Sequence, residues 1–495
     1  QIVAPLQNPF RGVSFSPDGN YVYYVNQETG GPGYSILYQI PVLGGSARKL
    51  IFDIDTAVTF SPDGKKLSFV RGYPQLGEEV LMVANADGTG EKKLAVRKRP
   101  DGFPTRAPSW SSDGKWIAAI ASSFEGGFHF EVIKVDAGDG KYSSIGSKRW
   151  LEISSLAWVP NGSALVLTAA DQIGGNHQVW SLSYPDAEAR RISNDLNEYI
   201  GVSVTADSKA LATTQAHHVS NLWISPASDS TAARQITFGS GDQDAIGGVA
   251  AAGADSVVFV AAEGDFRHLW RIGSDGSNRT RLTPESTHNF GLAVSRDERV
   301  IVFNSVREDG LAHIWRMDRE GGNPTQITSG KGEGLAGLSP DGRWILHGVA
   351  EKRGLWKLPV TGGASVKIAD DFLGDAVFSP DGKLIAYEGY IQKDGLLRRS
   401  ISVIPSDGGT AIQSLPYPDG FRLHWVPEGD AFTYYREVDG VSNVWRQSLD
   451  GTPPKQITDF KSGQIFSYDW APDGKTLILS RGQETSDIVL ITNFH

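Results

Sequence analysis

The chain has 495 residues, which is long for a single domain, and its hydrophobic content of 40% permits a packed core. The net charge of −10 argues against nucleic acid as the main partner, and no run of about eighteen apolar residues predicts a membrane span. The absence of cysteine excludes disulfides, thiol catalysis and Cys-based zinc sites.

One turn motif recurs along the chain, first as Phe-Ser-Pro-Asp-Gly at residues 15–19 and again at 60–64. Pro presets φ in such a turn, and Gly supplies a positive φ without strain. Copies follow one another at intervals of 40 to 50 residues, a period typical of β-propeller blades. The eleven copies are marked by Asp18, Asp63, Asp113, Asn161, Asp207, Asp255, Asp297, Asp341, Asp381, Glu428 and Asp473.

Each repeat predicts four strands. The turn leads into an apolar run such as Tyr21–Val25, then a strand with a central aromatic such as Trp180, then a Gly-containing hairpin. A short strand of the form Arg-x-Ile-Thr, as at Arg234–Thr237, ends the repeat. Four strands with turns between them make one propeller blade, and a single ring usually holds about 4–8 blades. The sequence therefore predicts an all-β chain of two tandem propellers with about eleven four-stranded blades.

The expected domains are an N-terminal propeller of about five blades at 1–246 and a C-terminal propeller of about six blades at 247–495. No Gly/Pro/Ser-rich linker marks the boundary, which we place near Gly247. Residues 1–5 have the character of a fourth strand, whereas the last repeat stops after its third. Two interpretations stay open: residues 1–5 close the last blade of the chain, or they are the remnant of a longer protein.

The motifs of catalysis are missing. The sequence has no Gly-x-Ser-x-Gly, no P-loop, no kinase His-Arg-Asp or Asp-Phe-Gly, and no His-Glu-x-x-His. We therefore expect no catalytic residues, no metal and no cofactor, and the chain itself is predicted not to be an enzyme.

Binding is expected in the loops that join the fourth strand of one blade to the first strand of the next, because loops on a rigid scaffold concentrate binding residues. In the N-terminal ring two successive loops are basic, and Trp150 lies beside them. Arg side chains there would recognise an acidic small molecule, peptide or protein in a bidentate manner. The alternative is that the basic residues pair with acidic neighbours. The candidate binding residues are Arg97, Arg99, Arg106, Lys148, Arg149, Trp150, Glu198, Tyr199 and Asp244.

The Ser-Pro-Asp-Gly-Lys turns and Arg-x-Leu-Thr strands resemble those of the TolB-like, PD40 (WD40-like) propeller family over the whole chain. Residues 1–5, 12–20 and 37–45, with 441–445, 454–462 and 486–491, look like the C-terminal region of bacterial eukaryotic-like serine/threonine kinases. The kinase resemblance implies an extracytoplasmic sensor or interaction region, periplasmic or at the cell surface. It also implies a kinase domain and a membrane segment upstream that tethers the propellers.

Two other functions remain open from the sequence. A periplasmic TolB-like protein would use its propeller to dock protein partners. A dipeptidyl-peptidase-type or tricorn-type enzyme would use propellers to gate a catalytic domain, whose motifs are absent from this chain.

Overall fold

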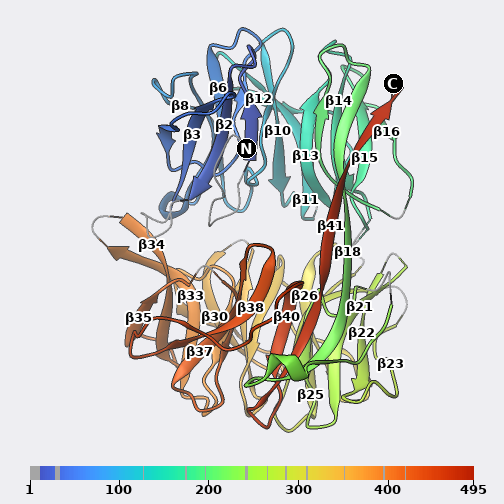
Figure 1. The fold of residues 1–495 in the computed structure, drawn as a ribbon, viewed down its shortest axis with the longest axis vertical. Coiled ribbons are helices and arrows are strands. Elements are labelled where there is room, and N and C mark those ends of the chain that lie inside the picture. Colours follow the sequence, from blue (N-terminus) through green and yellow to red (C-terminus); the bar gives the residue numbers. More distant parts are fainter. Residues whose placement is uncertain are drawn as a thin grey trace. The chain divides into compact units, whose positions relative to one another are not determined.

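The computed structural model describes residues 12–27, 34–125, 127–172, 175–195, 197–239, 243–264, 266–284, 287–307, 310–350, 352–393, 396–418 and 420–494. The strand expected at residues 1–5 lies outside these ranges. Within them the chain is built of β-strands and two single 3-10 turns, η1 (Pro74–Leu76) and η2 (Ser230–Ala232) (Figure 1). None of the described helical turns is long and apolar enough to cross a membrane.

The chain divides into two compact units. Unit 1 comprises Gln1–His217 and Ser486–His495, and unit 2 comprises His218–Thr485. Both crossings fall inside strands, β18 (Ala210–Pro226) and β41 (Thr476–Thr492). The division therefore lies before the boundary expected near Gly247. The turn motifs mark where each sequence repeat begins, whereas the chain passes from one unit to the other in the middle of a strand.

Unit 1 begins with four blades, each a four-stranded sheet in sequential order. Their strands are β1 (Gly12–Phe15), β2 (Tyr21–Gln27), β3 (Ser35–Pro41) and β4 (Arg48–Phe52); β5 (Thr59–Phe60), β6 (Lys66–Tyr73), β7 (Glu78–Asn85) and β8 (Lys92–Lys98); β9 (Ser109–Trp110), β10 (Trp116–Ser123), β11 (His129–Asp136) and β12 (Tyr142–Ser144); β13 (Glu152–Trp158), β14 (Ala164–Ala170), β15 (Gln178–Ser183) and β16 (Ala189–Arg191).

Unit 2 contains five blades of the same antiparallel pattern, the first two joined through one parallel residue pair. Their strands are β20 (Val249–Ala251), β21 (Ser256–Glu263), β22 (Phe266–Gly273) and β23 (Thr280–Arg281); β24 (His288–Val294), β25 (Val300–Val306), β26 (Ala312–Asp318) and β27 (Thr325–Gln326); β28 (Glu333–Leu338), β29 (Trp344–Val349), β30 (Lys352–Pro359) and β31 (Val366–Ala369); β32 (Ala376–Phe378), β33 (Leu384–Lys393), β34 (Leu396–Pro405) and β35 (Gln413–Pro416); β36 (Phe421–Trp425), β37 (Ala431–Val438), β38 (Val441–Ser448) and β39 (Lys455–Gln456).

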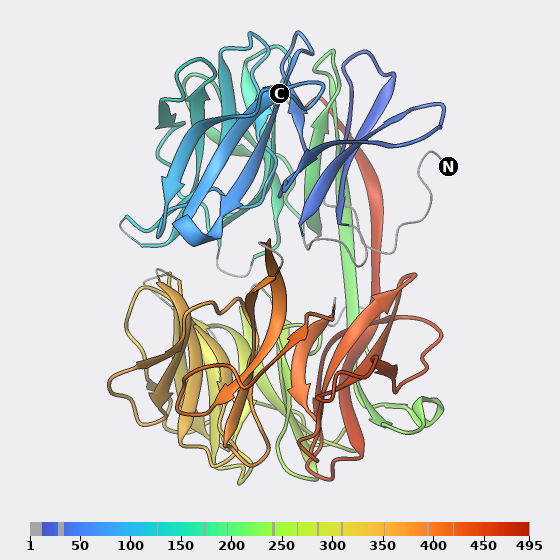
Figure 2. The same cartoon turned by 90° about the vertical axis from the view of Figure 1, so that its left-hand side faces the viewer.

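The remaining strands form one composite sheet that serves both units. β17 (Glu198–Val204) pairs with the first part of β18, and β19 (Arg234–Gln235) pairs with its last part. β40 (Gln464–Trp470) pairs with the first part of β41, and β18 and β41 are neighbours in the sheet. Figures 1 and 2 show these two long strands side by side. Unit 2 thus gains a sixth blade, made of β40, β41, β18 and β19. The first strands of its six blades contact one another in chain order, and the ring closes where β40 contacts β20.

The recurrent turn owes its sequence to hydrogen bonds that repeat from blade to blade. In the turn before β33, the Ser379 hydroxyl donates to Asp381 at 2.6 Å and accepts the Leu384 N–H at 2.9 Å. Asp381 accepts the Lys383 N–H at 3.1 Å. The Ser379 hydroxyl and then this N–H hold the pKa of Asp381 below its usual value. The acidic turn residues thus have a structural role.

Candidate functional site

The basic residues expected to form a binding surface in unit 1 are mostly engaged within the protein. Arg97 is 7% exposed, and it donates to the Ser122 carbonyl at 3.1 Å while lying 3.6 Å from Asp101 and 3.5 Å from Glu131. It belongs to β8 rather than to a loop. Its guanidinium is therefore not available to a ligand, and the expectation that Arg97 binds one is wrong.

Trp150 is 1% exposed and packs edge-on against Trp180, with ring centres 4.9 Å apart. Lys148 lies over both indoles and 3.4 Å from Asp171. Trp150 is thus a core residue and not a surface for stacking a ligand. Arg99 and Arg149 are exposed. The ion pairs of Arg97 and Lys148 favour the alternative interpretation, in which basic residues pair with acidic neighbours.

Arg106, Glu198 and Tyr199 lie around a partly buried histidine of unit 1. His177 contacts Glu198 at 2.5 Å and Glu152 at 3.7 Å, and Arg106 lies 3.8 Å from the same Glu152. Burial acts to lower the pKa of His177, but the Glu198 carboxylate outweighs it and the pKa is raised. Tyr199 is buried and donates to Asp195 at 2.8 Å. These contacts join the loops of three successive blades.

Asp244 belongs to unit 2 and not to the N-terminal ring where the sequence placed it. It is fully buried, and its carboxylate lies 3.1 Å from Arg279. Its backbone carbonyl accepts the hydroxyls of Ser220 and Ser480, which come from the two long strands. Asp244 therefore anchors the composite blade and does not join the basic residues of unit 1.

Unit 2 holds a group of ionisable residues that the repeat does not require. In each copy one residue stands directly before the aromatic or aliphatic residue that opens the turn. Nine copies have a neutral residue there, and two adjacent copies have His424 and Asp469. The eleven residues are Ser14, Thr59, Ser109, Ala157, Ser203, Ala250, Ala293, Gly337, Val377, His424 and Asp469. Departures of this kind from an otherwise consistent pattern are expected at functional sites.

The structure brings these two residues together on the first strands of neighbouring blades. His424 Nδ1 lies 3.4 Å from Asp469 Oδ1, and the imidazole packs against the Tyr468 ring at 4.6 Å. The Asp469 carboxylate accepts hydrogen bonds from the N–H of Ala251 on β20 at 3.0 Å and from the N–H of the adjacent Trp470 at 2.8 Å. The side chains of His424 and Asp469 are 26% and 25% exposed, so both can be reached from outside. We call His424 and Asp469, with Asp375, Arg422, Tyr435 and Tyr468, the β36–β40 cluster.

Burial shifts the titration of this cluster. It lowers the pKa of His424, against the opposing effect of the Asp469 and Asp375 carboxylates. It raises the pKa of Asp469, against the opposing effect of His424 and of two backbone N–H groups. It also raises the pKa of Tyr435 to about 12. Each shift disfavours the charged form of its group because burial removes water from it.

Arg422 occupies an unusual backbone position beside the pair. Its φ is 59°, in the left-handed region that residues other than Gly rarely adopt. The register of β36 against β37 shifts between Phe421 and His424, which is a bulge. The Leu423 N–H next to Arg422 lies 3.4 Å from Asp375 on the neighbouring blade. Bulges and strained residues of this kind concentrate at functional sites, where they re-aim a side chain.

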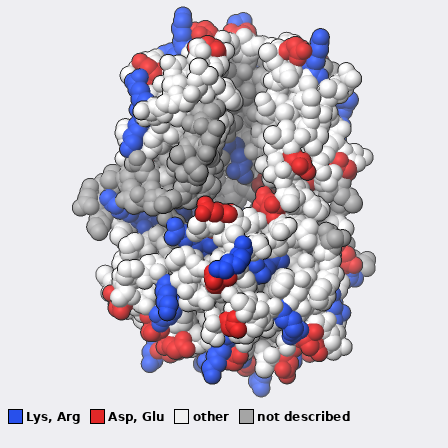
Figure 3. All heavy atoms as spheres, viewed as in Figure 1, with Lys and Arg blue, Asp and Glu red and all other residues white. Residues whose placement is uncertain are grey.

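The cluster offers recognition chemistry. Arg422 is exposed and carries a planar set of N–H donors for an acidic group. His424 contacts the Asp469 carboxylate and the Tyr468 ring. No group of three His, Asp or Glu side chains in the described ranges is arranged to hold a metal ion. Figure 3 shows Lys and Arg interspersed with Asp and Glu over the visible face of unit 2.

Sequence reasoning missed this cluster because it searched the loops, whereas His424 and Asp469 lie within first strands. Aligning the eleven repeats position by position would have found both. Arg422 carries no comparable signal, since a positive φ at an Arg is not readable from the sequence.

Comparisons with known proteins agree with a propeller and do not establish a family. No family model matches the chain. An uncharacterised protein of Agrobacterium fabrum is 27% identical over 142 residues, which are 28% of this chain and 46% of that protein. The Tol-Pal system protein TolB of Anaeromyxobacter dehalogenans is 27% identical over 164 residues, which are 32% of this chain and 36% of that protein. The matches thus span less than half the length of each relative.

Similar solved structures include the tricorn protease, at 12% identity and a TM-score of 0.33, covering 98% of this chain and 63% of that one. TolB from Acinetobacter baumannii shows 15% identity and a TM-score of 0.26, covering 79% of each chain. The β-propeller domain of the Trilobed protease from Pyrococcus furiosus shows 16% identity and a TM-score of 0.30, covering 66% of this chain and 99% of that one. The propeller fold is assigned from the four-stranded sheets of this chain and not from these TM-scores.

Proposed function

We propose that this chain is a binding region without catalytic activity of its own, and that a partner docks at the β36–β40 cluster of unit 2. One observation carries the proposal: the two ionisable departures from the repeat, His424 and Asp469, lie on adjacent blades and contact each other at 3.4 Å. Arg422, on the same strand as His424, would receive a carboxylate of an acidic small molecule, peptide or protein.

The finer proposal is that these propellers form the extracytoplasmic sensor region of a bacterial transmembrane serine/threonine kinase. The resemblance of residues 1–5, 12–20 and 37–45, with 441–445, 454–462 and 486–491, to the C-terminal region of such kinases supports it. On this proposal the parent gene encodes a kinase domain and an apolar span of about 20 residues upstream. Sequencing that gene tests it directly, because a secretory signal peptide in their place contradicts it.

A second candidate is a periplasmic docking protein of the TolB type. The local identity to a Tol-Pal system protein supports it, although that match covers 32% of this chain. Both candidates use the same surface chemistry, and they differ in what precedes the propellers in the gene. A gating role in a peptidase is the remaining alternative, and it would require a hydrolase domain in the same gene.

The site is tested by affinity capture from an extracytoplasmic extract of the source bacterium. The variant carries both His424→Asn and Asp469→Asn. Both residues are changed together because the loss of one alone would leave the other without its partner. We expect one partner to be retained by the wild-type chain and lost by this double variant. The binding of the purified partner, measured by calorimetry, should weaken by at least about tenfold, or about 1.4 kcal/mol.

The matched control is the pair Asp459→Asn and Lys461→Gln, which removes an exposed ion pair of unit 2 outside the cluster. Exposed pairs contribute about 0–1 kcal/mol, so this variant should fold and bind as the wild type does. Equal capture by all three proteins would contradict the site, and turnover of a peptide, ester or nucleotide by the purified chain would contradict the non-catalytic role.

A further inference from the structure

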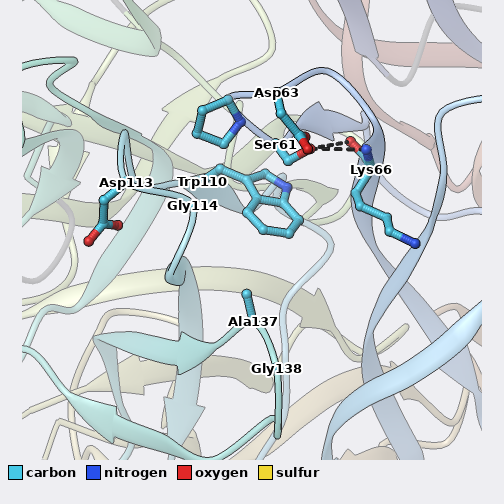
Figure 4. A pocket seen from close by; sticks show the side chains of 9 residues that line it. Ser61, Asp63, Lys66, Trp110, Asp113, Gly114, Ala137 and Gly138 are labelled. Atoms are coloured by element: carbon cyan, nitrogen blue, oxygen red, sulfur yellow. Dashed lines mark hydrogen bonds between the residues drawn. The ribbon is translucent and has the colours of Figure 1, made fainter.

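A pocket of about 460 Å³ opens between the recurrent turns of two adjacent blades in unit 1. Its volume falls within the range of about 300–1,000 Å³ that small-molecule sites occupy. Figure 4 shows the Trp110 indole in the middle of the lining, with Lys66 on one side and Asp113 on the other. Asp63 lies above the indole in that view, and Ala137 lies below it. This pocket is separate from the β36–β40 cluster, which belongs to unit 2.

Lys66 departs from the repeat in the same way as His424 and Asp469 do. It occupies the first position of the second strand, three residues after the marker residue of the turn in every copy but that of Asp255. The other ten copies have a neutral residue there: Tyr21, Trp116, Ala164, Ala210, Ser256, Val300, Trp344, Leu384, Ala431 and Thr476. The fold therefore does not require a cation at this position, yet Lys66 lines the pocket.

The lining offers both donors and acceptors. Lys66 Nζ donates to Asn85 at 2.8 Å, and an ammonium carries three donors. Asp63 and Asp113 each use Oδ1 to hold their own turns, through Ser61 and Ser111. Their Oδ2 atoms meet flexible exposed lysines, at 4.0 Å and 3.6 Å, which a ligand can displace.

This combination selects the class of ligand. Two carboxylates disfavour an anion, and the Lys66 ammonium disfavours a cation in the same small volume. A neutral ligand with many hydroxyl groups can satisfy donors and acceptors together, and an apolar C–H face of such a ligand can pack on an indole. A pyranose ring has both properties. We propose that this pocket is a saccharide-binding site for a neutral sugar, either free or at the end of a glycan.

The proposal is tested by saturation-transfer NMR on the whole chain. The probes are the methyl glycosides of glucose, galactose, mannose and N-acetylglucosamine, with glucuronate and choline as charged comparisons. A matching disaccharide of any sugar that binds separates a free monosaccharide from a glycan end, because an extended site binds the disaccharide more tightly. We expect at least one neutral glycoside to bind with a Kd in the range of about 0.1–10 mM.

Two variants and a control locate the binding. Ala137→Trp places a large side chain in the pocket and should abolish saturation transfer, whereas Lys66→Met should weaken binding by about tenfold, the cost of one charged hydrogen bond. Lys209→Met removes an exposed lysine after the corresponding turn of another blade, away from the pocket, and should bind as the wild type does. Binding that survives Ala137→Trp, a preference for glucuronate or choline, or no neutral glycoside bound at about 10 mM would each overturn the proposal.

Discussion

Two histidines, one in each unit, have pKa values shifted in opposite directions. Burial, with the nearby Arg267 and His268, lowers the pKa of His288 to about 4. Glu198 raises the pKa of His177. When burial depresses the pKa of a histidine, its protonation favours the unfolded chain, so stability falls as the pH drops below about 6.5 toward 4. When the pKa is raised, the contribution is full below about 6.5 and is lost as the pH rises through the folded value.

We expect His288→Gln to reduce the loss of stability between pH 7 and pH 5. At pH 5 the depressed pKa of His288 costs the folded state up to about 2 kcal/mol, since each pKa unit is worth about 1.4 kcal/mol. His177→Gln is the control with the opposite sign: it should destabilise the chain more at pH 5 than at pH 8. Denaturant unfolding at each pH measures both effects, and parallel pH profiles for the two variants would show that this assignment is wrong.

At the scale of strands, the sequence predicted the repeats well and the binding residues poorly, for one physical reason. The turn residues bond to each other within a few positions, as Ser379 and Asp381 do, so each copy of the motif predicts the strand that follows it. Whether Arg97 is exposed or paired depends on which residue of the next blade lies opposite to it. That residue is Glu131 on β11, and the spacing of the repeats does not predict this contact. The bulge at Arg422 similarly arises from pairing with β37. Register and inter-blade contacts decide which polar residues remain exposed.

The bulge in β36 gives a prediction that separates strain from charge. Arg422→Gly relieves the left-handed backbone at φ 59°, which costs a residue with a Cβ about 1 kcal/mol. Arg422→Ala removes the same guanidinium but keeps the strain. We therefore expect the Gly variant to be more stable than the Ala variant by up to about 1 kcal/mol in denaturant unfolding, although both should lose partner binding. An Ala variant as stable as the Gly variant would mean that the backbone of β36 at residue 422 is not strained.

At the scale of the whole chain, the two units share one sheet through β18 and β41, and the sequence did not show this. Both strands have 17 residues, more than twice the length of most blade strands. At the crossing β41 carries a polar run at residues 481–487 between two apolar runs, a pattern that predicts a turn between two separate strands rather than one continuous strand. As a result, the last residues of the chain belong to unit 1, although the residues before them belong to unit 2.

The C-terminus should therefore stabilise a unit that lies mostly near the other end of the sequence. Phe494 is 3% exposed and packs in a cluster of unit 1 with Val179, Tyr199 and Leu211. Its carbonyl accepts a hydrogen bond from Arg190 at 2.6 Å. Phe494→Ala should cost about 2–4 kcal/mol, somewhat less than in a rigid core because the chain end can relax.

Hydrogen exchange localises this effect, because opening free energies differ between cooperative regions of one chain. We expect Phe494→Ala to speed exchange in β14, β15 and β17, and to leave β25, β29 and β37 as they are in the wild type. Ile488→Ala, six residues earlier on β41 and 83% exposed, is the matched control and should change neither set. If β25 and β29 accelerate together with β14, the two units unfold as one, and the shared strands β18 and β41 transmit the loss of a single side chain through both.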